Sequence, residues 1–180
     1  MTNVDRRIPK TQEALQTAVL QLMTEKSFEK ITIQDLSDKA NVSRGTFYLH
    51  YRDKYDLLDK LIDTHIEELR ERCKGVANLD FPSAILTWTE YFNQHYSFFS
   101  LMLASKGATY FKNQFYNLLV EEFSDKFNTS EGKNKDFNTD LIISFLASAY
   151  AGVVEWWFTN ERPVTHQALA EQLGGLLERI

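Results

Sequence analysis

The architecture of this chain follows from one stretch near its N-terminus, Thr32-Ile33-Gln34-Asp35-Leu36-Ser37-Asp38-Lys39-Ala40-Asn41-Val42-Ser43-Arg44-Gly45-Thr46-Phe47-Tyr48-Leu49-His50-Tyr51. Thr32 is a good helix cap, and Asp35 three residues later completes the pattern of a capping box. Asn41 tolerates the left-handed backbone that ends a helix, and Ser43 is a suitable cap for the next helix, residues 44–51. Two short helices joined by such a tight turn are typical of a helix-turn-helix, whose second helix enters the major groove of DNA.

Apolar residues at helical spacing continue on both sides of this stretch. They predict helices over residues 10–26, 54–74, 81–103 with a break around His95, 108–127, 137–159 and 164–178, separated by a polar loop over 128–136. The helix over 54–74, which Gly75 ends, would span roughly 30 Å and link two modules. Because no convincing strand is present, we expect an all-α fold of about nine helices.

This pattern predicts two domains. We expect residues 1–53 to form a three-helix, helix-turn-helix DNA-binding domain, and residues 54–180 to form a larger helical domain. The net charge of −5 is unevenly spread, because residues 1–56 carry nine Lys/Arg against eight Asp/Glu while the remainder is acidic. DNA phosphates would repel the second part and not the first.

Composition excludes several other classes of protein. The chain has 180 residues, 43% of them hydrophobic, which suits a soluble globular protein. Its single cysteine, Cys73, allows no internal disulfide and fits a reducing compartment. The polar N-terminus has no secretory signal, and no apolar run reaches the ~20 residues that span a bilayer. We therefore expect a cytoplasmic protein that does not enter a membrane.

The stretch quoted above resembles the DNA-binding domain of the TetR family of transcriptional regulators. The most specific part is Val42-Ser43-Arg44-Gly45-Thr46-Phe47-Tyr48, followed by His50, Tyr51 and Lys54, and the resemblance extends over residues 10–61. The family often has glycine where Ser27 and Asn41 stand, but both replacements keep the capacity to form turns. A second, weaker resemblance, over residues 145–157, is to the C-terminal domain of a Gram-positive TetR subgroup.

The resemblance implies DNA contacts residue by residue. Phosphates are held at the positions of Thr32, Ser43, Tyr48, His50 and Lys54, and base edges are faced by Arg44, Gly45 and Thr46. Arg44 would pair with guanine, Gly45 would permit close approach, and Thr46 would touch a thymine methyl. An N-terminal arm with Arg6, Arg7 and Lys10 would add phosphate or minor-groove contacts. The residues alone leave open a structural role for His50 or Lys54, a merely exposed ring for Tyr48, and a solvated tail for the arm.

The resemblance also implies a homodimer and a small hydrophobic or aromatic ligand. The last two helices pair with their two-fold mates in this family, which predicts an interface that contains Phe145, Ala149, Gly152, Val153, Trp156, Leu169, Leu173 and Leu176. A ligand would lie among aromatic residues of the sensor helices, Trp88, Tyr91, Phe92, Tyr96, Phe99, Tyr110, Phe111 and Phe115. An aromatic stripe at helical spacing is more often core than pocket, so both interpretations stay open.

The resemblance therefore implies a ligand-responsive repressor that binds a near-palindromic double-stranded DNA operator as a dimer. A TetR-like coactivator or adaptor that acts through a protein partner remains an alternative. An enzyme is not expected, because the sequence has no glycine-rich phosphate loop, no nucleophile elbow and no metalloprotease motif. His65, Glu67, Glu68 and His95 offer few polar anchors and no reliable metal-ligand spacing. We therefore expect neither a cofactor nor a metal ion.

Overall fold

The computed structural model describes residues 7–74, 80–104, 108–126 and 136–179. Within these ranges the chain forms nine α-helices, one short 3-10 helix and no strand, which confirms the all-α prediction. The chain divides into two compact units, Met1–Thr64 and His65–Ile180, so the division falls within the long fourth helix rather than before it.

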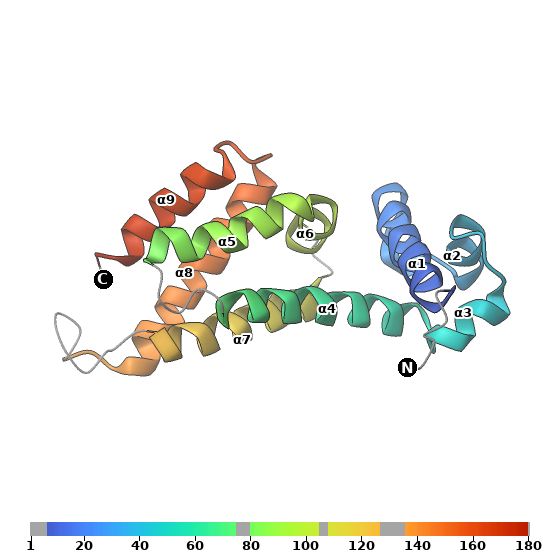
Figure 1. Cartoon of the computed structure of the whole chain (residues 1–180), viewed down its shortest axis with the longest axis horizontal. Coiled ribbons are helices and arrows are strands. Elements are labelled where there is room, and N and C mark those ends of the chain that lie inside the picture. Colours follow the sequence, from blue (N-terminus) through green and yellow to red (C-terminus); the bar gives the residue numbers. More distant parts are fainter. Residues whose placement is uncertain (1–6, 75–79, 105–107, 127–135, 180) are drawn as a thin grey trace, which may run out of the picture. The chain divides into compact units, whose positions relative to one another are not determined.

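The helices of the N-terminal unit pack around a small apolar core. Its elements are α1 (Arg7–Glu25), η1 (Phe28–Lys30), α2 (Ile33–Lys39), α3 (Arg44–His50) and the first part of α4 (Lys54–Lys74). Helix α1 packs on α2, and α2 packs on α3 (Figure 1). The core is apolar and fully buried, with Leu15, Leu36, Phe47 and Leu57 at its centre. Burial of this face is what stabilises helices as short as α2 and α3.

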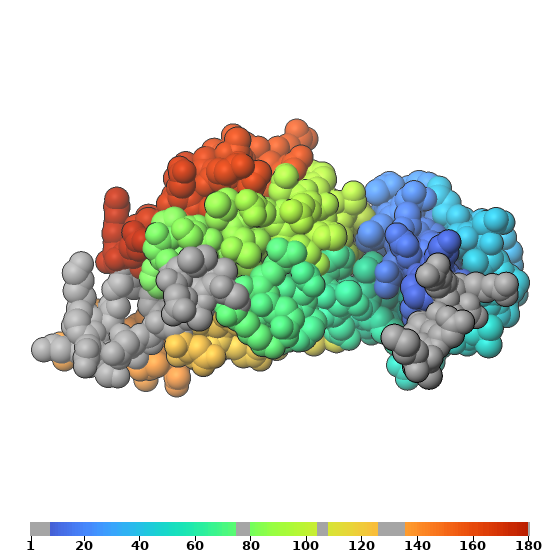
Figure 2. All heavy atoms as spheres, viewed as in Figure 1, coloured from blue at the N-terminus to red at the C-terminus, as the bar shows by residue number. Residues whose placement is uncertain are grey.

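The C-terminal unit is a bundle rich in aromatic residues. After the end of α4 it contains α5 (Phe81–Gln94), α6 (Tyr96–Ala104), α7 (Thr109–Lys126), α8 (Thr139–Thr159) and α9 (His166–Leu177). Helix α5 runs alongside α9, and α8 packs against α6 and α7. Figure 2 shows the side chains of α9 in close packing along α5.

The contact between α5 and α9 depends on a glycine. A Cβ atom added at Gly174 would lie 2.6 Å from both the backbone N and the Cα of Pro82. Pro82 stands in the first turn of α5, after the Asp80 cap. The two helices can approach this closely only because Gly174 has no side chain.

Most helix boundaries agree with the sequence predictions. The fourth helix and the break at His95 are confirmed. Helix α8 begins later than expected because the Asn138 side chain accepts a hydrogen bond from the Leu141 N–H and caps it. Helix α9 begins after Thr165, whose hydroxyl accepts from the Ala168 N–H, and not directly after Pro163. Arg6, Gly75 and most of the predicted loop over 128–136 lie outside the described residues.

Helix α8 is the single described helix that is long and apolar enough to cross a membrane by length and composition. A core helix of a water-soluble bundle passes the same test. Eight side chains of α8 are buried in the C-terminal unit. Leu141, Phe145, Ala149 and Trp156 of this helix are exposed, which bears on the candidate interface described below.

Candidate functional site

The turn between α2 and α3 is closed by backbone hydrogen bonds. Asn41 has a φ of 53°, the left-handed conformation that its side chain was predicted to tolerate. The Val42 N–H donates to the Ser37 carbonyl at 2.9 Å, and the Asn41 N–H donates to the Asp38 carbonyl at 3.2 Å. This pair of bonds is a Schellman motif, which ends α2 and fixes the direction in which the chain enters α3.

Both helices of the motif have the caps that the sequence predicts. The Thr32 hydroxyl accepts from the Asp35 N–H at 3.1 Å, and an Asp35 carboxylate oxygen accepts from the Thr32 N–H at 2.8 Å. Lys26 pairs with the same carboxylate at 2.8 Å. Hydrogen bonds from Lys26 and then from Thr32 lower the pKa of Asp35 to about 2, so this cap is ionised at any physiological pH.

Helix α3 is capped by Ser43. The Ser43 Oγ accepts from the Thr46 N–H at 3.0 Å, and the two hydroxyls share a further hydrogen bond at 2.8 Å. Ser43, Arg44 and Gly45 are exposed, and Thr46 is half-buried. A Cβ atom at Gly45 would meet nothing closer than the Ser43 Oγ at 3.6 Å. The fold therefore does not require glycine at this position.

The two faces of α3 differ sharply. Phe47 and Tyr51 are buried, as predicted, with ring centroids 5.8 Å apart. Tyr48 is 51% exposed and Leu49 is 81% exposed. Sequence reasoning missed Leu49, although its place between the core positions Phe47 and Tyr51 was a usable signal. Because the Leu49 side chain is exposed, it contributes little to the hydrophobic core. Such an apolar side chain on this helix can contact a thymine methyl.

Lys54 is engaged inside the N-terminal unit. Its ammonium donates to the carbonyls of Phe28, Glu29 and Ile31 at 2.9, 2.7 and 2.9 Å, and it lies 5.1 Å from the centre of the Phe28 ring. A lysine has three N–H donors, and these carbonyls use all of them. The side chain therefore holds the loop between α1 and α2. His50 is half-buried beside Tyr51, and Lys10 is exposed, while the side chains of Arg6 and Arg7 are not described.

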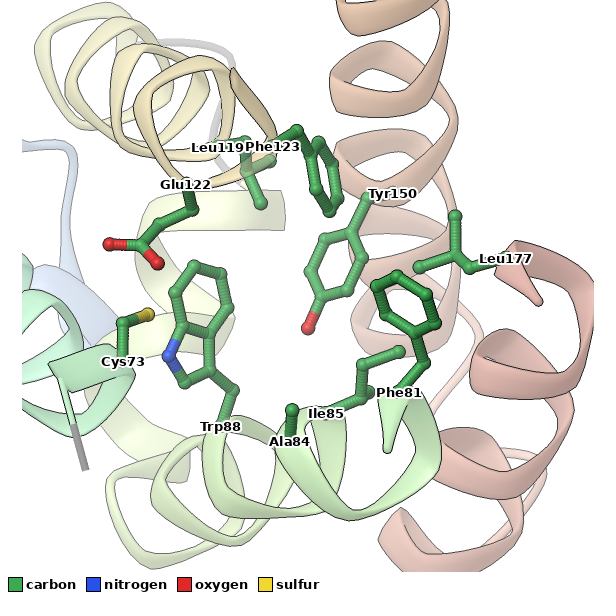
Figure 3. A pocket seen from close by; sticks show the side chains of 10 residues that line it. All are labelled: Cys73, Phe81, Ala84, Ile85, Trp88, Leu119, Glu122, Phe123, Tyr150 and Leu177. Atoms are coloured by element: carbon green, nitrogen blue, oxygen red, sulfur yellow. The ribbon is translucent and has the colours of Figure 1, made fainter. Parts of the chain in front are cut away.

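The C-terminal unit contains a small cavity lined by α4, α5, α7, α8 and α9 (Figure 3). Its volume is about 50 Å³, and its apolar lining includes Phe81, Ile85, Trp88, Leu119, Phe123 and Leu177. Cys73, Glu122 and Tyr150 complete it. Of the aromatic residues predicted to form a pocket, this cavity contains only Trp88.

The other predicted pocket residues fill the core or lie near the surface. Tyr91, Phe92, Phe99, Phe111 and Phe115 are buried. They pack ring against ring, for example Phe92 on Phe99 at 4.7 Å and Phe111 on Phe115 at 5.7 Å. Tyr96 stacks on Phe158 at 5.6 Å, and Tyr110 is exposed. The five buried rings correspond to the core interpretation that the sequence left open, whereas Tyr110 lies outside the core.

One polar pair is buried within this aromatic core. His65 is 7% exposed, and its Nδ1 lies 2.7 Å from the Tyr91 hydroxyl. Its ring stacks on Phe98 at 3.8 Å. Burial, and to a lesser degree the neighbouring His95, lowers the pKa of His65 to about 4. The imidazole is therefore neutral near pH 7. The described residues contain no group of three or more His, Cys, Asp or Glu side chains placed to hold a metal ion.

The described residues leave an apolar face on α8 uncovered. Exposed residues at helical spacing form it, Leu141, Phe145, Ala149, Gly152 and Trp156, and Leu176 of α9 is exposed as well. Val153 is half-buried. Leu169 and Leu173, which the sequence assigned to a dimer interface, are instead buried in the chain's own bundle. The assignment of these two leucines is corrected, because the inner face of α9 packs on α5.

Comparisons with known proteins agree with this arrangement. Residues 16–61 match a family model described as "Bacterial regulatory proteins, tetR family", and residues 80–179 match one described as "Transcriptional regulator C-terminal region". The chain is 27% identical to a TetR transcriptional regulator from Streptococcus agalactiae 2603V, with a TM-score of 0.74 and 96% of each chain covered.

Two further relatives are regulators by name. The chain is 43% identical over 67 residues to the uncharacterised HTH-type regulator YxbF of Bacillus subtilis (strain 168), a match that covers 37% of this chain and 18% of YxbF. It is 23% identical over 172 residues to the probable acrEF/envCD operon repressor of Escherichia coli (strain K12), covering 83% of this chain and 76% of that protein.

Proposed function

Because the chain belongs to the TetR family of DNA-binding transcriptional regulators, we propose that it is a cytoplasmic, ligand-responsive repressor that binds a near-palindromic operator as a homodimer. The families and relatives it matches are regulators rather than enzymes, and one of them is named as an operon repressor. No observation favours the alternative of a coactivator.

The observation that carries the proposal is the two-faced α3. Phe47 and Tyr51 anchor it in the core, while Arg44, Gly45, Tyr48 and Leu49 face outward at the end of a turn that hydrogen bonds fix. In this proposal Arg44 pairs with a guanine and the exposed Leu49 contacts a thymine methyl. Thr46 is half-buried and reaches bases through its methyl group, because its hydroxyl already pairs with Ser43.

We assign phosphate contacts to fewer residues than the family resemblance implies. Thr32 and Ser43 stand at helix N-termini, where N–H groups and the helix dipole favour anions. Tyr48 offers an exposed hydroxyl, and His50 a half-buried ring. We leave Lys54 out of this set, because its three donors are used by the loop carbonyls.

Dimerisation through the exposed face of α8 would place two copies of α3 on one DNA. A contiguous apolar face is costly in water, and a second copy of the same face would cover it in a two-fold interface. Phe145, Gly152 and Trp156 lie along it, and Gly152 has nothing within 4 Å of where its Cβ would stand, so a partner helix has room to approach. Leu176 extends the face onto α9.

The test is selection of bound sequences from a random DNA pool by the purified full chain at one stated salt concentration. We expect an enriched near-palindrome with half-sites about one helical turn apart. Arg44→Ala should weaken binding by about 1–3 kcal/mol and relax one position in each half-site. Equal losses on every sequence would show that Arg44 contacts phosphate instead. No enrichment by a folded dimer would favour the adaptor and refute the proposal.

The dimer is tested separately by sedimentation equilibrium. A double variant, Phe145→Glu with Trp156→Glu, should be monomeric, because it places four carboxylates across a two-fold interface. Asn117→Glu, at an exposed position of α7, is the matched control and should leave the dimer intact. A double variant that remains dimeric would place the interface elsewhere.

A further inference from the structure

The strongest unexplained feature of the C-terminal unit is the hydroxyl of Tyr150. The side chain is 2% exposed, and its oxygen has no hydrogen-bond partner in the described structure. Its ring is fixed from three sides, by Trp88 at 5.7 Å, Phe115 at 6.4 Å and Phe123 at 6.0 Å. Figure 3 shows the hydroxyl directed into the cavity between α5, α7 and α8.

A buried hydroxyl without a partner destabilises a protein, and such groups are rare in folded chains. Phenylalanine would fill the same space without that cost. The Trp88 indole does not resolve the problem, because its Nε1 already donates to the Leu69 carbonyl at 3.2 Å. The unused donor of Tyr150 therefore points to a partner that comes from outside the chain.

The cavity restricts the chemistry of that partner. Its volume of about 50 Å³ exceeds the roughly 10–15 Å³ that one water occupies on the same measure, so it admits a group of several heavy atoms. The walls are almost entirely apolar, which disfavours a charged molecule. Figure 3 shows the Glu122 carboxylate turned away from the Tyr150 hydroxyl, and its negative charge further disfavours an anion.

We propose that this cavity binds a small, neutral, mostly apolar molecule with one hydrogen-bond acceptor, such as a ketone or aldehyde oxygen, and that the Tyr150 hydroxyl donates the bond that anchors it. The proposal deepens the ligand response proposed above and rests on it for its regulatory meaning. Cys73 of α4 lines the same cavity, and α4 continues into the N-terminal unit. A ligand here contacts the helix that connects sensing to DNA binding.

The test compares two probes of the same shape, cyclohexanone and methylenecyclohexane, which differ only in the acceptor oxygen. Calorimetric titration of the full chain should show about tenfold tighter binding of cyclohexanone, the value of one neutral hydrogen bond. Tyr150→Phe should lose this preference and bind methylenecyclohexane at least as tightly, because the ketone oxygen would then be buried without a donor. Tyr116→Phe is the matched control, because its hydroxyl pairs with the Ser144 Oγ at 3.0 Å, and it should keep the preference. A preference that survives in Tyr150→Phe, or no binding of either probe, would overturn the proposal.

A second measurement keeps the test independent of the probes. The thermal midpoint of Tyr150→Phe without any ligand should equal or exceed that of the original chain, because an unpartnered hydroxyl is removed. A clear fall would show that the hydroxyl has a partner inside the folded chain, which also overturns the proposal. Release of selected DNA by cyclohexanone is scored separately. Probe binding with the expected preference but without release supports the site and refutes the proposed ligand response.

Discussion

The contact between Gly174 and Pro82 allows a quantitative test of the C-terminal bundle. Gly174→Ala would place a Cβ atom 2.6 Å from two backbone atoms of Pro82, where ordinary contacts begin at 3.4 Å. Neither atom can rotate away, so α5 and α9 must separate by most of an ångström. Leu169, Leu173 and Leu177, which are buried on the inner face of α9, would lose contacts along with them.

The expected change in the free energy of unfolding for Gly174→Ala is the balance of two effects. Alanine is favoured over glycine inside a helix by about 1 kcal/mol, while overpacking of a close contact costs typically about 1–3 kcal/mol, occasionally more. Alanine at Gly175 brings only the first effect, because nothing lies within 4 Å of its Cβ position. We expect Gly175→Ala to raise the free energy of unfolding by up to about 1 kcal/mol. Gly174→Ala combines both effects, so it should lower the free energy of unfolding by up to about 2 kcal/mol.

The assay is urea unfolding of the full chain, followed by circular dichroism at one protein concentration, because dimerisation makes stability depend on concentration. Equal m-values would show that both variants unfold as the original chain does. Equal stability of the two variants would refute the close approach of α5 and α9. A strong loss in Gly175→Ala alone would show that a second chain covers that face.

Three further predictions concern single interactions. The pKa of His65 is about 4 in the folded chain and near 6.5 in the unfolded chain, so the unfolded chain binds a proton first as the pH falls. The free energy of unfolding should therefore drop by about 3 kcal/mol between pH 6.5 and 4 and stay level above pH 6.5. His65→Phe should remove this pH dependence, measured by urea unfolding at each pH. Asn41→Gly should raise the thermal midpoint, because glycine adopts a φ of 53° without the steric cost of about 1 kcal/mol that a side chain brings. A lower midpoint would show that the asparagine side chain makes a stabilising contact. Lys54→Met should lower the free energy of unfolding without DNA by about 1–3 kcal/mol, because three carbonyls lose their donor, whereas Arg44→Ala should leave it unchanged.

The sequence predicts the N-terminal unit well because the signals there are local. The Thr32 and Ser43 caps, the left-handed Asn41 and the buried pair Phe47 and Tyr51 each depend on residues a few positions away. Capping and turn formation are short-range effects, so a window of a few residues contains the information needed. The predicted start of the last helix, at residue 164, was two residues too early, because Thr165 caps α9.

The C-terminal unit is predicted in its helices but not in its sites. The spacing of apolar residues shows that a helix has a buried face, but not which of two neighbouring helices or copies covers it. The family resemblance assigned Leu169 and Leu173 to a partner chain, and their spacing could not correct this, although both are buried where α9 packs on α5. The cavity was missed because its lining comes from five helices, and no sequence pattern reports that one tyrosine oxygen among them has no acceptor.

Lys54 and Arg44 have the same predicted role but different surroundings in the fold. Both are basic residues within the same stretch, and the resemblance gives both to DNA. The fold places three backbone carbonyls, from residues more than twenty positions upstream, around the Lys54 ammonium. Arg44 stands exposed at the start of α3. Lys54, whose ammonium the fold has already bonded, fixes the loop between α1 and α2, and we propose that the exposed Arg44 contacts DNA. The free energy of unfolding of Lys54→Met, measured without DNA, tests the structural role. A lysine that holds the loop lowers this free energy when it is replaced, whereas a lysine that only contacts phosphate does not.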